Sequence, residues 1–118
     1  MADTVDRVTD DVSHGATEFA IDVRAATDDP VVVVRGVIDF ETSNRVRETL
    51  ASLARDDRRG VTLDIGGVTF VDSVGLSVLV QAKKRFAAAG QELRFANVAP
   101  TVRRTVEIAG AVEFLGIP

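Results

Sequence analysis

Asp72 and Ser73 are the residues of this sequence whose types and position could support regulated chemistry. Residues 61–65 alternate apolar and polar side chains as a strand does, and residues 76–83 place apolar side chains at helical spacing. The pair therefore stands at the start of a predicted helix, where side-chain oxygens accept hydrogen bonds from unpaired backbone N–H groups. One interpretation is that Ser73 only caps this helix. The other is that its hydroxyl carries a regulatory phosphate, which the positive end of a helix tolerates.

Two enzyme classes that use a serine or a phosphate are disfavoured by the residues present. A serine hydrolase needs a base beside Ser73, but the single histidine, His14, lies in a predicted flexible tail. Residues 71–75 also lack the first glycine of a nucleophile elbow. A phosphate-binding loop needs a lysine soon after its glycines, whereas the first lysine after residues 66–67 is Lys83. We therefore expect a protein that is not an enzyme.

Carboxylates could bind a metal ion, but their spacing does not favour one. Asp39, Asp64 and Asp72 are not spaced as in a calcium loop, and the sequence has no cysteine. Turn, strand-face and cap positions explain these three residues as well, so neither a metal nor a cofactor is expected. Asp39 follows one predicted strand and Asp72 follows the next parallel unit. Both should therefore lie at the same edge of the sheet, where they could form one surface.

The elements that position these residues predict a single α/β domain. Strands are indicated by alternation or by a continuous apolar run, and helices by apolar residues three or four positions apart. The expected strands are 19–24, 31–34, 61–65 and 92–96, and the expected helices are 41–55, 73–89 and 100–110. The expected fold class is a small mixed sheet of about four to five strands with helices packed on it.

The connections between these elements predict the pairing of the strands. Residues 27–30 have the composition of a hairpin turn, and the order strand, helix, strand implies parallel neighbours. The apolar run 31–34 indicates a central strand covered on both faces. The two glycines at 66–67 should end the third strand. Three apolar residues should pack the C-terminus onto the core, namely Phe114, Leu115 and Ile117.

Composition bounds the size of the domain and disfavours several partners. The chain has 118 residues, 46% hydrophobic and 27% charged, which suits one core and is too short for two. A net charge of −4 disfavours nucleic acid and anionic membranes as partners. Because no secretory signal or apolar run of about 18 residues is present, a cytoplasmic location is expected. Residues 1–17 carry four aspartates against one arginine, which predicts a flexible acidic tail before a domain at 18–118.

The stretch Asp72-Ser73-Val74-Gly75-Leu76 resembles a signature of the STAS domain family, in particular of the bacterial anti-sigma factor antagonists. Residues 36–39 resemble that family's Gly-Glu-(apolar)-Asp segment, and residues 97–110 resemble its last helix. Residues 61–64 and 67–70 precede the signature as they do in the family. The resemblance runs from about residue 19 to residue 117, in the expected order and spacing.

The resemblance implies a partner-switching regulator of transcription, of the kind that acts in stress responses and sporulation-like programmes. In the family, the serine that matches Ser73 accepts a phosphate from an anti-sigma factor that is also a serine kinase. The unmodified domain would bind this kinase and free the sigma factor. The phosphorylated domain would be released, and a phosphatase would reset it. The implied partner-binding residues are Asp39, Asp72, Ser73, Val74, Gly75 and Leu76.

Two positions depart from the family pattern. Val37 stands where an acidic residue is frequent, so any partner contact by that carboxylate is absent. Val74 stands where many members have a second serine, which removes a competing phosphate acceptor. The alternative function is a STAS scaffold or sensory module that binds partners without being phosphorylated.

Overall fold

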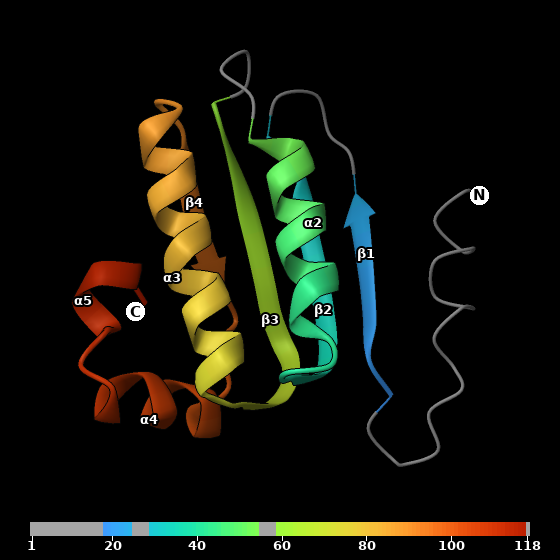
Figure 1. Cartoon of the computed structure of the whole chain (residues 1–118), viewed down its shortest axis with the longest axis vertical. Helices are drawn as coiled ribbons and strands as arrows, with labels where there is room; N and C mark the ends of the chain where they lie inside the picture. The colour runs from blue at the N-terminus through green and yellow to red at the C-terminus, as the bar shows by residue number, and fades with distance from the viewer. Residues whose placement is uncertain (1–17, 25–28, 55–58, 118) are drawn as a thin grey trace.

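A four-stranded mixed sheet supports the helices of this domain (Figure 1). The computed structural model describes residues 18–24, 29–54 and 59–117. In these ranges the elements are, in order, β1 (Ala20–Arg24), β2 (Val31–Ile38), α2 (Ser43–Leu53), β3 (Gly60–Val71), α3 (Ser73–Ala88), β4 (Glu92–Ala96), α4 (Pro100–Ile108) and α5 (Val112–Leu115). The predicted α/β fold class is confirmed. The predicted acidic tail, residues 1–17, lies outside the described residues.

The strand order explains why the two long helices lie on one face of the sheet. β1 pairs antiparallel with β2, whereas β2 with β3 and β3 with β4 pair in parallel, in the order β1-β2-β3-β4. α2 and α3 connect the parallel strands, and both connections step across the sheet in the same direction. Crossovers of one hand then place both helices on the same face, as Figure 1 shows. The predicted hairpin pairing and parallel pairings are confirmed, although the turn at 27–30 lies partly outside the described residues.

The valine run of β2 is covered by these helices on one face. Val32 and Val34 are fully buried, whereas Val31 and Val33, which point to the opposite face, are half-buried. The central place of β2, between β1 and β3, is confirmed. The prediction that both of its faces are covered is wrong, because both crossover helices pack on the same face.

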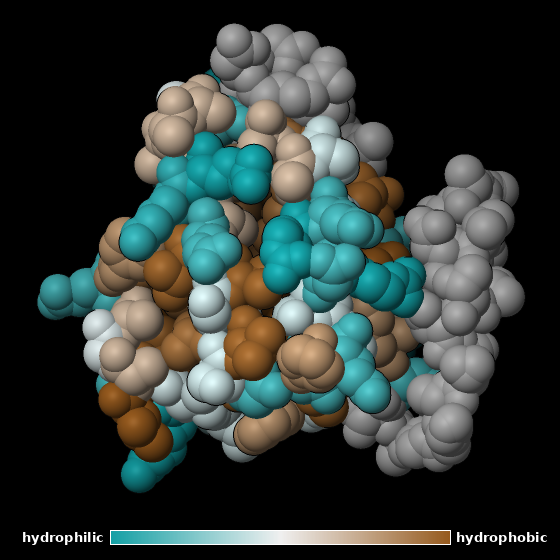
Figure 2. All heavy atoms as spheres, in the orientation of Figure 1, coloured by the Kyte–Doolittle hydropathy of each residue, from teal (hydrophilic) through white to brown (hydrophobic). Residues whose placement is uncertain are grey.

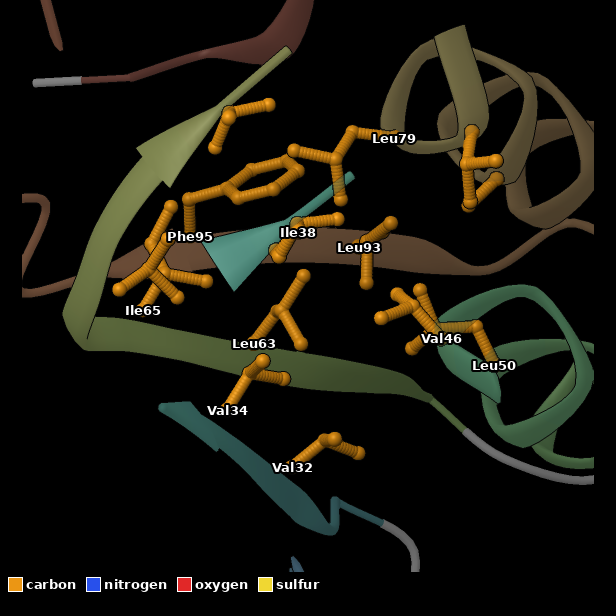
Figure 3. Packing of buried hydrophobic residues seen from close by; sticks show 14 of the residues in the cluster. Val32, Val34, Ile38, Val46, Leu50, Leu63, Ile65, Leu79, Leu93 and Phe95 are labelled. Atoms are coloured by element: carbon orange, nitrogen blue, oxygen red, sulfur yellow. The ribbon is translucent and has the colours of Figure 1, made fainter. Parts of the chain in front are cut away.

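The core fills the space between the sheet and these two helices. α2 contributes Val46 and Leu50, and α3 contributes Leu79 and Phe86, each at most 1% exposed. Complete burial of such a side chain contributes about 1.5–3 kcal/mol. Figure 3 shows Val46, Leu50 and Leu79 facing the strand residues Val32, Val34, Ile38, Leu63, Ile65, Leu93 and Phe95. Seen from outside, the helical face carries hydrophilic and hydrophobic residues side by side (Figure 2).

β3 continues through the glycine pair and is longer than predicted. It runs from Gly60 to Val71, and its register against β2 shifts twice, once on each side of Arg35 and Gly36. Gly67 lies opposite Arg35, and a Cβ atom there would stand 2.8 Å from Arg35 Cγ. A glycine thus lets a bent strand keep its pairing instead of ending it. The bend is visible in Figure 3, and it brings the chain to residue 72 while still beside the end of β2.

The C-terminal segment contains a short helix, α5, that the sequence pattern did not predict. Leu115 and Ile117 are buried as expected, but Phe114 is 45% exposed, so its predicted packing is wrong. In this four-residue helix Leu115 is buried and Val112 packs partly buried against the core, which leaves Phe114 on the outer side. Across the described ranges, no helix combines the length and apolarity that a membrane span needs.

Candidate functional site

The two loops predicted to share one edge of the sheet do meet there. Asp39 follows β2 directly and Asp72 follows β3 directly. The backbone N–H of Phe40 donates a hydrogen bond to Asp72 Oδ2 at 3.2 Å. The backbone N–H of Asp72 donates to the Ile38 carbonyl oxygen, also at 3.2 Å. The end of β2 and the start of α3 are therefore held together around Asp72.

Asp72, and not Ser73, caps helix α3. Asp72 has the extended backbone of an N-cap residue, and its Oδ1 accepts a hydrogen bond from Gly75 N–H at 2.8 Å. Ser73 is the first helical residue. Both oxygens of the Asp72 carboxylate therefore accept bonds from backbone donors, one in α3 and one in the β2–α2 turn. The interpretation of Ser73 as the helix cap is wrong.

The hydroxyl of Ser73 is exposed and makes no hydrogen bond within the described part of the chain. The neighbouring carboxylate of Asp72 already accepts two backbone bonds, so it is poorly placed to remove a proton from this hydroxyl. A nucleophilic serine needs a base within hydrogen-bond reach. Ser73 thus has the accessibility of a modification site and lacks the activating partner of a catalytic serine.

Of the three residues that follow Ser73, one is exposed and two are packed within the domain. Val74 is 39% exposed, Leu76 is half-buried against the core, and Gly75 is buried. A Cβ atom on Gly75 would stand 2.3 Å from the Ile38 carbonyl oxygen. Only a glycine lets the first turn of α3 approach the end of β2 so closely. Gly75 and Leu76 therefore position the site, and Val74 is the one that a partner could touch most fully.

Asp39 orders the turn between β2 and α2. Its Oδ1 accepts hydrogen bonds from the backbone N–H groups of Glu41 at 3.0 Å and Thr42 at 3.1 Å. The Thr42 hydroxyl donates to the Val37 carbonyl at 2.7 Å and accepts from the Asp39 N–H at 3.0 Å. The Ser43 N–H donates to the Asp39 carbonyl at 2.8 Å. These bonds make Asp39 the residue that orders the turn leading into α2, which is the turn role that the sequence left open for it.

Two exposed aromatic residues at this edge were missed by the sequence interpretation. Phe40, in the β2–α2 turn, is 75% exposed, and Phe70, near the end of β3, is 53% exposed. We call Phe40, Phe70 and Val74 the apolar rim. The signal in the sequence was an aromatic residue between Asp39 and Glu41, in a turn where polar residues are usual.

The charged residues of the two loops that meet at Ser73 are carboxylates. Asp39, Glu41 and Asp72 belong to the two loops, and the segments 36–44 and 70–80 contain no lysine or arginine. Within the described ranges, no three histidine, cysteine or acidic side chains come together as metal ligands would. A hollow of about 340 Å³ is present elsewhere, against α4 and α5. The edge around Ser73 is thus an acidic and apolar surface that suits contact with a macromolecule.

The comparison with known proteins agrees with this architecture. The STAS domain family model matches residues 20–117. An anti-sigma-B factor antagonist of Staphylococcus aureus is 27% identical over 86 residues, covering 73% of this chain and 80% of that protein.

Solved structures share the fold at lower identity. An anti-sigma factor antagonist from Mycobacterium paratuberculosis has a TM-score of 0.72 at 22% identity and covers 82% of both chains. The anti-sigma factor antagonist SpoIIAA in its unphosphorylated form has a TM-score of 0.66 at 18% identity, covering 77% of this chain and 81% of its own. Bacillus SpoIIAA in its phosphorylated form has a TM-score of 0.63 at 17% identity, covering 77% and 84%. With the family model matched over nearly all of the described domain, this chain belongs to the STAS domain family.

Proposed function

We propose that this domain is an anti-sigma factor antagonist that switches partners through phosphorylation of Ser73. Unphosphorylated, it binds an anti-sigma factor serine kinase and frees the sigma factor. Phosphorylated, it is released, and a phosphatase returns it to the binding form. The observation that carries the proposal is the Ser73 hydroxyl, exposed at the first position of α3 and relieved of capping by Asp72. A relative of similar length is named an anti-sigma-B factor antagonist, and SpoIIAA, which shares the fold, exists in phosphorylated and unphosphorylated forms.

The surroundings of Ser73 favour release after phosphorylation. A phosphate adds a charge of about −1.5 to −2. Near Ser73 it meets the carboxylate of Asp72, and the segments 36–44 and 70–80 offer no lysine or arginine to neutralise it. Burying such a group against a partner without a cationic counterpart is strongly unfavourable. Because about 1.4 kcal/mol changes an affinity tenfold, one phosphate is enough to move binding by orders of magnitude.

The proposed role is regulatory and not catalytic. Ser73 has no base of its own within the described residues, so the kinase must supply the base and the ATP. The backbone N–H groups at the start of α3 tolerate the product, since helix N-termini favour anions. The fold itself need not change when the phosphate is added.

The test is incubation of the purified protein with anti-sigma factor kinases of its source organism and ATP, followed by intact-mass analysis and peptide mapping. We expect one phosphate, on Ser73. Ser77, exposed one turn further along α3, provides the matched control. Ser73→Ala should take up no phosphate and bind the kinase constitutively, Ser73→Asp should bind weakly, and Ser77→Ala should behave as wild type. Equal binding of Ser73→Ala and Ser73→Asp would refute the switch, and binding without phosphorylation would favour an unphosphorylated scaffold.

For Asp39 we propose an additional contact with the partner. Asp39→Ala would also remove the turn bonds to Glu41 and Thr42, so it cannot separate folding from binding. Asp39→Asn keeps an oxygen that accepts those bonds and removes only the charge. A lower affinity or slower phosphorylation of Asp39→Asn, at unchanged stability, is the expected result. If neither changes, Asp39 is a turn residue and nothing more.

A further inference from the structure

We propose that the apolar rim, Phe40, Phe70 and Val74, anchors the domain in an apolar pocket of the anti-sigma factor. The inference rests on the proposed function and adds the chemistry of the contact. It predicts that affinity in the unphosphorylated state comes mainly from these apolar side chains. The acidic residues of the edge, Asp39 among them, then contribute less to the affinity than the rim does.

The rim stands out because large apolar side chains are rarely exposed in this domain. Among the described residues five are exposed, and three of them, Phe40, Phe70 and Val74, lie next to the site: Phe40 is bonded to Asp72, Phe70 precedes Asp72 by two residues and Val74 follows Ser73. Exposed apolar groups gathered in one place mark interaction sites more often than scattered ones. The remaining two, Ile108 and Phe114, lie at the end of α4 and in α5.

Phe40 has the features of an interface anchor. It is 75% exposed, yet its backbone is fixed, because its N–H donates to Asp72 Oδ2 and the turn around it is closed by Asp39 and Thr42. A side chain presented by an ordered backbone loses little conformational freedom on binding. Aromatic residues in such positions are frequent hot spots of protein interfaces. The bond that Phe40 N–H donates to Asp72 therefore links the proposed phosphorylation site to the proposed anchor.

The position of the rim beside Ser73 indicates which partner covers it. A kinase that transfers a phosphate to Ser73 must bring its active site to that hydroxyl. Val74 is the next residue, and Phe70 stands two residues before Asp72, a chain distance of at most about 7 Å. Phe40 is bonded to Asp72 itself. The protein that reaches Ser73 therefore covers the rim as well, and an apolar pocket is the surface that can bury these side chains favourably.

The experiment measures the dissociation constant of each unphosphorylated variant by titration calorimetry, with the kinase that phosphorylates Ser73 and without ATP. Phe40→Ala and Phe70→Ala each test the rim. Two substitutions elsewhere are matched controls by exposure. Ile108, at 77%, matches Phe40 at 75%, and Phe114, at 45%, matches Phe70 at 53%.

We expect Phe40→Ala to weaken binding at least about tenfold and Phe70→Ala several-fold, with Ile108→Ala and Phe114→Ala within about twofold of wild type. Phe40→Leu, which keeps an apolar side chain, should retain most of the affinity. Thermal unfolding of each variant checks that exposed substitutions leave the fold intact. Wild-type affinity in Phe40→Ala, or equal losses in the controls, would overturn the rim as anchor while the switch at Ser73 stands. If no kinase binds the wild-type domain, the proposed function fails, and the rim inference falls with it.

Discussion

Removal of the Asp72 carboxylate tests how the phosphorylation site is built. The Asp72 carboxylate accepts two bonds, from Gly75 N–H to Oδ1 at 2.8 Å and from Phe40 N–H to Oδ2 at 3.2 Å. Losing an N-cap bond costs about 1 kcal/mol, within a range of roughly 0.5–2 kcal/mol. The second bond joins an exposed N–H that water can solvate, so its loss costs about 0.5–1.5 kcal/mol. Asp72→Ala should therefore lower the free energy of unfolding by about 2 kcal/mol.

Asp72→Ser separates the two contributions. Serine is a good N-cap and can keep the bond to Gly75, but its single oxygen cannot also reach Phe40. We expect a loss of about 1 kcal/mol, half of that in Asp72→Ala. Ser73→Ala is the control, because Ser73 does not cap α3 and its removal should leave stability nearly unchanged.

Urea titrations monitored by far-ultraviolet circular dichroism give these free energies, provided that the m-value is the same in all variants. Wild-type stability in Asp72→Ala would refute the capping role. Wild-type stability in Asp72→Ser would show that the bond to Phe40 contributes nothing. If Ser73→Ala lowered the free energy of unfolding as much as Asp72→Ala, the serine would be the cap. Its hydroxyl would then not be available to accept a phosphate.

Three further outcomes can be measured in the same titrations. Gly75→Ala should destabilise the domain by about 1–3 kcal/mol because the new methyl group would stand 2.3 Å from the Ile38 carbonyl oxygen, and a gain from helix propensity would contradict this. Gln91→Leu should raise the free energy of unfolding by about 1 kcal/mol, since both polar atoms of this buried amide lack a hydrogen-bond partner among the described residues, and a loss would show that they have one in solution. Arg94→Met should cost less than about 1 kcal/mol, and less still at high salt, because Arg94 and Asp29 form a half-exposed ion pair. Its hydrogen bond with Asp29 raises the pKa of Arg94, so the arginine stays charged and the pair's contribution does not decline between pH 7 and 10; a decline in that range would point to another group.

Local patterns determined the elements and the place of the acceptor serine. The predicted helix 73–89 is α3, Ser73–Ala88, and the predicted helix 100–110 begins with Pro100 as α4 does. Neighbours along the chain decide such features: a cap residue bonds to the next turn, and proline suits the first turn because it lacks an N–H group. The same reasoning placed Asp39 and Asp72 at one edge, since successive parallel strands end on the same side of a sheet.

Tertiary contacts decided which of these side chains form hydrogen bonds within the domain and which remain available to a partner. Sequence alone left Ser73 as a cap or an exposed hydroxyl, and the answer depends on the two backbone donors that reach Asp72, one of them from Phe40, 32 residues earlier. It also predicted that β3 would end at Gly66. The strand continues because β2 stays beside it through two register shifts, and an alternating pattern carries no information about its partner strand.

The exposure of Phe40 and Phe70 was likewise decided by the assembled fold. A hydrophobic residue in a sequence is expected inside, and its neighbours along the chain do not reveal whether another element covers it. Here α2 and α3 pack on one face of the sheet (Figure 1), and Phe40 and Phe70, at the ends of β2 and β3, stay exposed among the described residues. The sequence by itself thus determined the strands, the helices and the position of Ser73. The register, the bonds of Asp72 and the exposed apolar rim exist only once segments distant in sequence are packed together, because each depends on contacts that no local pattern encodes.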